Sequence, residues 1–124
     1  MDRLRRVGRW ACVIVLAAAF VLIGGSKLRA PSAARWSERF VHWGLPARAS
    51  YAVGVLEVVG GLGLLIPRSR RAAAATLLAV MIGALLTHLV NGEVPRVVPP
   101  LVLGGVALVV YRSETRTYSP SRDG

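Results

Sequence analysis

Three ionisable side chains lie in or beside apolar segments, and they are the best candidates for chemistry. Glu57 lies near the middle of the apolar segment 49–66, Lys27 ends the first such segment, and His88 lies near the end of the third. A carboxylate deep in a bilayer costs at least ~2.5 kcal/mol, so it faces a partner, a cavity or a proton. We predict that Glu57 forms a buried charge pair or proton-handling site with Lys27 or His88.

Two hydroxyl groups complete this candidate site for a ligand, a partner or a proton. Tyr51 begins the segment that contains Glu57, and Thr87 precedes His88. The alternative is structural: Glu57 pairs with Lys27 or with backbone of the first helix only to fix how the helices align. Lys27 can also extend its ammonium group to the membrane surface.

The elements that position these residues are predicted from composition and hydropathy. The chain has 124 residues, of which 54% are hydrophobic, and a mean hydropathy of +0.53. Four apolar segments, at about 7–28, 49–66, 72–90 and 94–112, approach the ~20 residues that a spanning helix needs. They are continuously apolar rather than alternating, which argues against strands. We predict an all-α integral membrane four-helix bundle in one domain, 1–112, followed by a disordered cytoplasmic tail, 113–124.

The first segment also resembles a secretory signal peptide. Four arginines precede it, and Ser32-Ala33-Ala34 is a passable cleavage site. Cleavage would leave three helices, and the glycines and Lys27 suit the C-terminal end of a retained helix. An uncleaved first helix is therefore the better interpretation.

The net charge of +10 would suggest nucleic acid on a soluble domain, but in a membrane protein it reports topology. Ten of the sixteen Lys and Arg residues precede the first helix, separate the second from the third, or follow the fourth. The other six lie in the two opposite loops. The positive-inside rule predicts that both termini are cytoplasmic. We expect the bilayer and no nucleic acid as a partner.

The longest connection contains an amphipathic helix at about 32–43. Trp36, Phe40 and Trp43 recur at spacings of four and three residues, as on one helix face. Such a helix lies in the membrane interface with its aromatic residues as anchors. The alternative is that it is a lid over a site on the outer side.

Glycines predict where helices approach closely. Gly54, Glu57 and Gly61 share one stripe of the helix 49–66, which also contains Gly60. The helix 72–90 offers small residues around Gly83. We expect these two helices to pack tightly and to carry Glu57 toward His88 or Lys27, and the same glycines permit a homo-oligomer.

Residue types and motifs that the sequence lacks exclude several chemistries. Cys12 is the only cysteine, so an intrachain disulfide and a Cys-x-x-Cys redox motif are excluded. Two histidines, in different segments, do not predict haem ligation, and no spacing typical of a metal site occurs. We expect no metal, no required cofactor and no self-sufficient enzyme, and we assign no catalytic residue.

Several short motifs together resemble the DoxX-like small membrane proteins of bacteria. They are Gly24-Gly25-Ser26-Lys27-Leu28, Trp43-Gly44-Leu45-Pro46, the run from Val53 to Gly61 with Pro67 after it, and His88. The matched positions are Lys27, Gly54, Glu57, Gly60 and His88. The resemblance implies a four-helix bundle in the bacterial inner membrane. For the wider family it implies links to membrane redox systems, because a subunit of thiosulfate:quinone oxidoreductase bears the family's name.

We therefore expect an accessory or scaffolding subunit of a membrane redox assembly, with a membrane or peripheral redox protein as partner. A quinone headgroup is a candidate ligand around Glu57. One alternative is a proton-coupled transporter similar to the small multidrug resistance proteins, although their glutamate lies in the first helix. Another is a purely structural scaffold.

Overall fold

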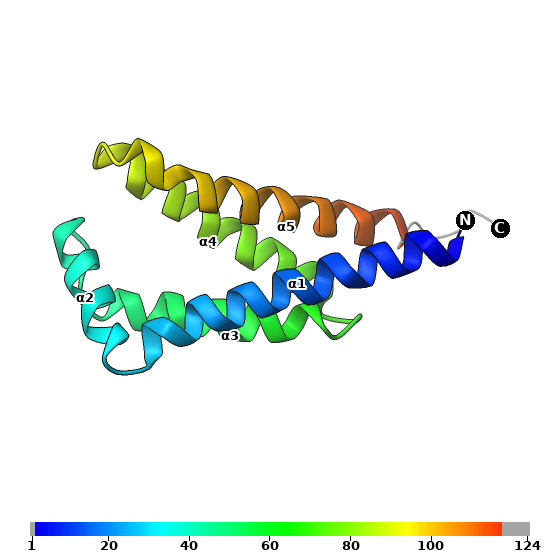
Figure 1. Ribbon diagram of the computed structural model, residues 1–124, viewed down its shortest axis with the longest axis horizontal. Helices are drawn as coiled ribbons and strands as arrows, with labels where there is room; N and C mark the ends of the chain where they lie inside the picture. Colours follow the sequence, from blue (N-terminus) through cyan, green and yellow to red (C-terminus); the bar gives the residue numbers. More distant parts are fainter. Residues whose placement is uncertain (1, 118–124) are drawn as a thin grey trace.

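The computed structural model describes residues 2–117, with side chains as far as Glu114 (Figure 1). Its elements are α1 (Asp2–Leu28), α2 (Ser32–His42), α3 (Ala49–Leu64), α4 (Arg70–Val90), the 3-10 helix η1 (Val94–Val97) and α5 (Val98–Thr117). No strand occurs among these residues, so the all-α prediction is confirmed.

The helix ends differ from the prediction in ways that local chemistry explains. α1 begins at Asp2 rather than near residue 7, since the arginines of this segment are good helix formers. α3 ends at Leu64, shortly before Pro67, whose ring disfavours helix in the preceding residue. α5 continues to Thr117, so residues 113–117 are helical and not disordered as predicted. The rest of the predicted tail, 118–124, lies outside the described residues.

Three segments of the described chain are long and apolar enough to cross a membrane: α1, α4 and Val94–Glu114. α3 is apolar but has only 16 residues. At 1.5 Å per residue it rises about 24 Å, less than the ~30 Å of a hydrocarbon core. Length and composition thus support three of the four predicted spans.

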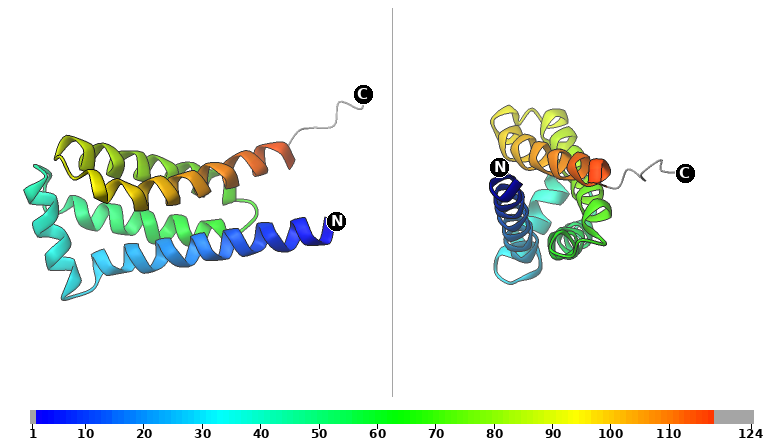
Figure 2. Two further views of the ribbon diagram at one scale, coloured as in Figure 1. Left: turned by 45° about the horizontal axis from the view of Figure 1, so that its top comes forward. Right: turned by 90° about the vertical axis from the view of Figure 1, so that its right-hand side faces the viewer.

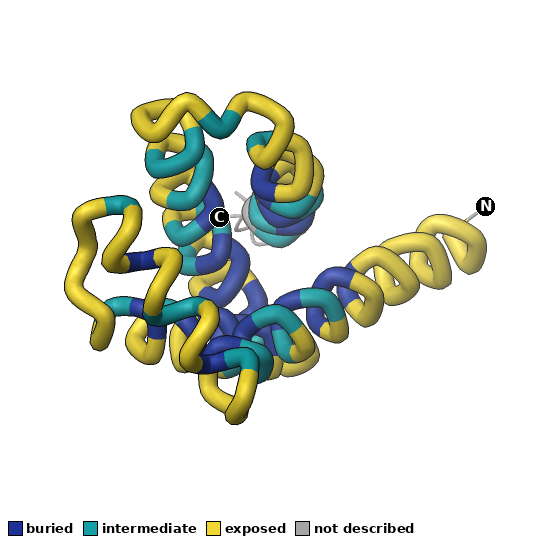
Figure 3. The backbone as a smooth tube through the Cα atoms, turned by 60° about the vertical axis from the view of Figure 1, so that its left-hand side comes forward, coloured by how far each residue is buried: buried dark blue, intermediate teal, exposed yellow. Residues whose placement is uncertain are grey.

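The long helices form two pairs. α1 packs along α3, α5 packs along α4, and α3 contacts α4, which joins the pairs. Figure 1 shows the pairs diverging toward one end, where α2 lies, and Figure 2 shows α2 crossing that end. We call this the α2 end, and we call the opposite end, with the α3–α4 turn, the turn end. Residues 2–12 of α1 form an exposed segment at the turn end (Figure 3).

The apolar core lies toward the turn end. It joins Phe20 and its neighbours on α1 with residues of α3, α4 and α5, and its buried members are Val13, Leu16, Ala17, Phe20, Leu64, Ala73, Ala74, Leu77, Met81, Ala107 and Val110. The buried residues nearer α2 include Lys27, Ser50 and Glu57. Apolar packing therefore dominates one end, whereas the other also depends on polar contacts.

The glycine stripe packs against a different helix from the one predicted. A Cβ atom added to Gly54 would lie 2.9 Å from the carbonyl oxygen of Gly24, and one added to Gly61 would lie 3.0 Å from that of Ala17. Both neighbours belong to α1, so the predicted packing of this stripe on the helix 72–90 is wrong. α3 meets α4 instead through Gly60, where a Cβ would lie 2.8 Å from the Leu77 side chain. Gly83 has no such neighbour within 4 Å.

Candidate functional site

A buried ion pair joins α1 to α3 at the α2 end. Lys27 Nζ lies 2.6 Å from Glu57 Oε1, and the two side chains are 6% and 0% exposed. Gly24 and Gly54, each one turn before a member of the pair, let the two backbones touch. The structure thus pairs Glu57 with Lys27, as one of the predicted alternatives has it, and His88 is not a partner of Glu57.

The second oxygen of Glu57 has no partner. Oε2 is buried and accepts no hydrogen bond within the described chain. A buried acceptor without a donor costs about 1–3 kcal/mol. The pair is thus incompletely satisfied, and a ligand that offers a hydroxyl or amide hydrogen would complete it.

α2 covers this pair with aromatic side chains. The Lys27 ammonium lies 4.1 Å from the centre of the Trp36 ring, and Trp36 Nε1 donates a hydrogen bond to Ser26 Oγ at 3.0 Å. Phe40 is buried, and its ring lies 5.4 Å from that of Trp43. The aromatic face of α2 therefore points toward the other helices, which is the arrangement that the lid alternative requires. Its use as a membrane anchor stays a prediction.

A cavity of about 680 Å³ lies beneath α2 and between the diverging helix pairs. Residues of all five α-helices and of η1 line it: Ile23, Lys27, Trp36, Arg39, Phe40, Trp43, Leu45, Val53, Glu57, Val80, Met81, Gly83, Ala84, Thr87, His88, Pro95, Arg96, Pro99, Pro100 and Leu103. A mainly apolar wall with a few polar groups is typical of a small-molecule site of this size. The ion pair belongs to that wall.

A second polar cluster, centred on Glu93, fastens α2 to the start of η1. Trp43 Nε1 donates to Glu93 Oε1 at 2.8 Å, His88 Nδ1 lies 3.1 Å from the same oxygen, and Arg96 Nη1 donates to Oε2 at 3.0 Å. The hydrogen bond to His88 is the largest of the effects that lower the pKa of Glu93. His88 thus belongs both to the cavity wall and to the Glu93 cluster, which holds α2 against the start of η1.

Sequence reasoning missed Glu93 because it lies in a short polar connection. A signal was nevertheless present: the chain has six acidic residues against sixteen basic ones, so every carboxylate has several cations available.

Of the predicted hydroxyl groups, Thr87 lines the cavity and donates to the Gly83 carbonyl, at 2.8 Å. Tyr51 is 46% exposed and is absent from the cavity wall.

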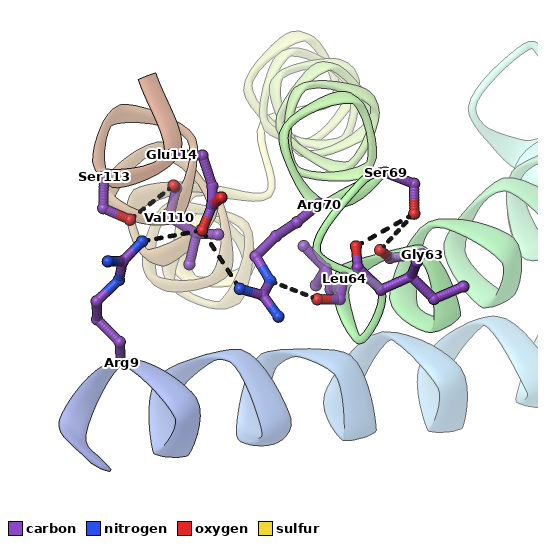
Figure 4. A network of polar contacts seen from close by, with 9 residues as sticks. Arg9, Gly63, Leu64, Ser69, Arg70, Val110, Ser113 and Glu114 are labelled. Atoms are coloured by element: carbon purple, nitrogen blue, oxygen red, sulfur yellow. Dashed lines mark hydrogen bonds and ion pairs between the residues drawn. The ribbon is translucent and has the colours of Figure 1, made fainter. Parts of the chain in front are cut away.

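A third polar cluster lies at the turn end and was also missed (Figure 4). Glu114 Oε1 lies 3.0 Å from Arg9 Nη2 and 3.4 Å from Arg70 Nη1. Arg70 Nε donates to the Leu64 carbonyl at 2.7 Å, and its guanidinium carbon lies 4.7 Å from the centre of the Trp10 ring. We call Arg9, Arg70 and Glu114 the turn-end cluster. It joins α1, α4 and α5.

Metal-ligating side chains do not gather at any of these clusters. In the part of the chain that the structure describes, no three residues among His, Cys, Asp and Glu lie close enough to hold a metal ion. The free Cys12 is exposed on the N-terminal part of α1.

Comparison with known proteins agrees with the resemblance seen in the motifs. A family model described as the DoxX-like family matches residues 11–110, which include both members of the ion pair and the whole cavity wall. No curated protein and no solved structure matches the chain.

Proposed function

The chain belongs to the DoxX-like family, and we propose that it is a membrane-embedded accessory subunit of a redox assembly whose cavity holds the headgroup of a quinone. The observation that carries this proposal is the cavity of about 680 Å³ with the buried Lys27–Glu57 pair in its wall. Quinones are lipid-soluble rings with two polar oxygens, so they need an apolar site with few, well-placed polar groups.

The pair can serve both redox forms of such a ligand. An ammonium group is a hydrogen-bond donor only, so Lys27 would donate to a quinone carbonyl. A carboxylate is an acceptor only, so the unpartnered Oε2 of Glu57 would accept from the hydroxyl of the reduced form. Trp36 and Trp43 would flank the ring beneath α2. The chain would hold the ligand while a partner protein exchanges electrons with it.

The accessory role is supported by the family and by the side chains at hand. The resemblance to DoxX-like proteins implies a link to membrane redox systems, and this chain has one cysteine, Cys12, which lies outside the cavity wall. A sulfur-transfer or electron-transfer reaction would therefore use groups of the partner. We propose a membrane or peripheral oxidoreductase as that partner.

We propose that α1, α3, α4 and α5 all span the bacterial inner membrane, with the α2 end outward. The distribution of positive charge along the sequence supports this orientation, since ten of the sixteen Lys and Arg residues lie in segments that the predicted topology assigns to the opposite side. A membrane-impermeant maleimide tests it in intact cells. With Cys12 replaced by Ser, Arg48→Cys should be labelled and the matched Arg68→Cys should not, and the reverse pattern would overturn the orientation.

Tryptophan fluorescence tests quinone binding. Trp36 and Trp43 line the cavity and Trp10 lies at the turn end, so a short-chain benzoquinone should quench the Trp10→Phe protein and spare the Trp36→Phe/Trp43→Phe protein. In the Trp10→Phe background, Lys27→Met should weaken binding about tenfold, as expected for a lost hydrogen bond to a charged group. Circular dichroism verifies that each variant is folded. Unchanged binding by a folded Lys27→Met protein would contradict the proposal.

Proton-coupled transport is a second candidate function, favoured by the same unpartnered Oε2 of Glu57, because an intramembrane carboxylate beside a cavity can carry a proton. Proteoliposomes with an internal pH dye distinguish the two. Proton flux that depends on an added cation and disappears in Glu57→Gln would favour transport. Normal partner assembly by Glu57→Gln, with neither flux nor quinone binding in the wild type, would favour a scaffold.

A further inference from the structure

The turn-end cluster holds more positive than negative charge, and we propose that it binds the phosphate of an anionic phospholipid headgroup. This site is separate from the quinone cavity, and the proposal does not depend on the function assigned there.

The first argument is hydrogen bonding. Arg9 and Arg70 both bond to the same oxygen, Oε1 of Glu114. Nη2 of Arg70 is buried and has no hydrogen-bond partner among the described residues, and the residue is only 8% exposed. A guanidinium group presents its donors in a planar fork that matches a phosphate. An unfilled donor on a buried guanidinium therefore points to an oxygen-rich anion as the missing acceptor.

The second argument is the field around this donor. Arg70 is the first residue of α4, and the side chain of the preceding Ser69 does not cap the helix but donates to the Gly63 carbonyl at 2.8 Å. The N–H groups of the first helical turn thus add their positive potential to that of the arginines. The neighbouring Arg71, whose guanidinium carbon lies 5.4 Å from the Tyr111 ring centre, contributes another cation.

The third argument identifies a lipid as the source of the phosphate. Trp10, which lies against Arg70, is 41% exposed, and Ile14 and Val109 are exposed on α1 and α5. Cationic groups beside an exposed tryptophan, on helices that also expose apolar side chains, suit the boundary between headgroups and acyl chains. A free phosphate ion would use the cations but not this apolar surface.

The test uses Trp10 as the reporter, in a Trp36→Phe/Trp43→Phe background. The purified protein in detergent is titrated with phosphatidylglycerol that carries brominated acyl chains, which quench tryptophan on contact. The matched control lipid is brominated phosphatidylcholine. We expect phosphatidylglycerol to quench at a concentration at least about fivefold lower, the effect of one cation acting on an anionic lipid.

Variants separate a binding site from a structural ion pair. Arg70→Gln should weaken phosphatidylglycerol binding by about fivefold or more. Glu114→Gln should tighten it, because it removes the anion that competes with the phosphate, whereas a merely structural cluster would be loosened and bind more weakly. Arg96→Gln, a change of the same charge at the α2 end, should have no effect.

Four results would overturn the proposal. They are equal quenching by the two lipids, displacement of phosphatidylglycerol by an equal concentration of inorganic phosphate, unchanged binding by a folded Arg70→Gln protein, and weaker binding by Glu114→Gln. If Arg70→Gln does not fold, Arg9→Gln replaces it, since Arg9 is partly exposed and its loss should still weaken binding. The quinone titration in the Trp10→Phe background is independent of all four.

Discussion

The two ends of the molecule both hold a charged cluster between helices, but they differ in which buried atom lacks a hydrogen-bond partner: an acceptor at one end and a donor at the other. At the α2 end one ammonium meets one carboxylate, and the unpartnered atom is an acceptor, Glu57 Oε2, beside a cavity. At the turn end two guanidinium groups meet one carboxylate, and the unpartnered atom is a donor, Arg70 Nη2, beside the apolar core. The comparison teaches that the kind of atom left without a hydrogen-bond partner, an acceptor or a donor, indicates the kind of ligand that would complete each cluster.

The largest effect should come from breaking the pair at the α2 end. Glu57→Ala leaves Lys27 buried without a carboxylate, and removal of one partner of a buried pair costs about 3–5 kcal/mol. Thermal unfolding in detergent measures this loss. The double variant Lys27→Met/Glu57→Ala should be more stable than Glu57→Ala alone, because it removes the unpaired charge. A double variant less stable than Glu57→Ala would show that the two residues do not act as a pair.

A smaller effect should follow from separating the two backbones that carry this pair. A Cβ on Gly24 would lie 2.7 Å from the Gly54 carbonyl oxygen, whereas one on Gly25 would lie within 4 Å of no atom from another element of the described chain. Gly24→Ala should therefore destabilise the protein by about 1–3 kcal/mol. Gly25→Ala is the matched control and should be neutral or stabilising, since alanine favours helix. Equal melting temperatures for the two variants would refute the close α1–α3 contact.

The corresponding change at the turn end should be smaller still. The Arg9 side chain is 44% exposed, so Arg9→Gln removes an ion pair that solvent already screens. Pairs of this kind contribute about 0.2–1 kcal/mol. Chemical unfolding in detergent should place this variant close to the wild type. A loss as large as that of Glu57→Ala would mean that the turn end, and not the α2 end, contains the critical pair.

The smallest predicted effect is the pH dependence of the Glu93 cluster, which holds α2 against the start of η1. The folded-state pKa of Glu93 lies below its ordinary value of 4.5, mainly because of the hydrogen bond to His88. The contribution of Glu93 to the stability of the fold is therefore present above pH 4.5 and is lost as the pH falls through the folded-state pKa. Trp43 fluorescence should change in that acidic range. Glu93→Gln should abolish the change, and a change that persists in Glu93→Gln would assign it to another group.

The α2-end pair was predictable because so few charged residues occur in the apolar segments. Glu57 had to meet a cation or a cavity, and Lys27 was one of two candidates. Helical periodicity also placed Gly54, Glu57 and Gly61 on one face. Periodicity could not identify the neighbouring helix, because the period of one helix carries no information about which other helix lies beside it. In the structure, α1 faces this stripe.

The turn-end cluster was not predictable by the same reasoning. Its arginines were interpreted as topology signals, and Glu114 fell within the segment predicted to be disordered. Nothing in a one-dimensional pattern shows that Arg9 and Glu114, 105 residues apart, meet across a helix pair. The cavity was likewise invisible, since it arises from the divergence of two helix pairs and not from any motif.

The most direct test of the account is to identify what the protein carries from its native membrane. Wild type, Lys27→Met and Arg70→Gln would be purified in mild detergent at matched expression, and mass spectrometry would identify the bound lipid-soluble molecules and proteins. The account predicts a quinone, together with an oxidoreductase subunit, in the wild type and in Arg70→Gln, and much less quinone in Lys27→Met. A wild type without quinone, or equal quinone in Lys27→Met, would contradict it.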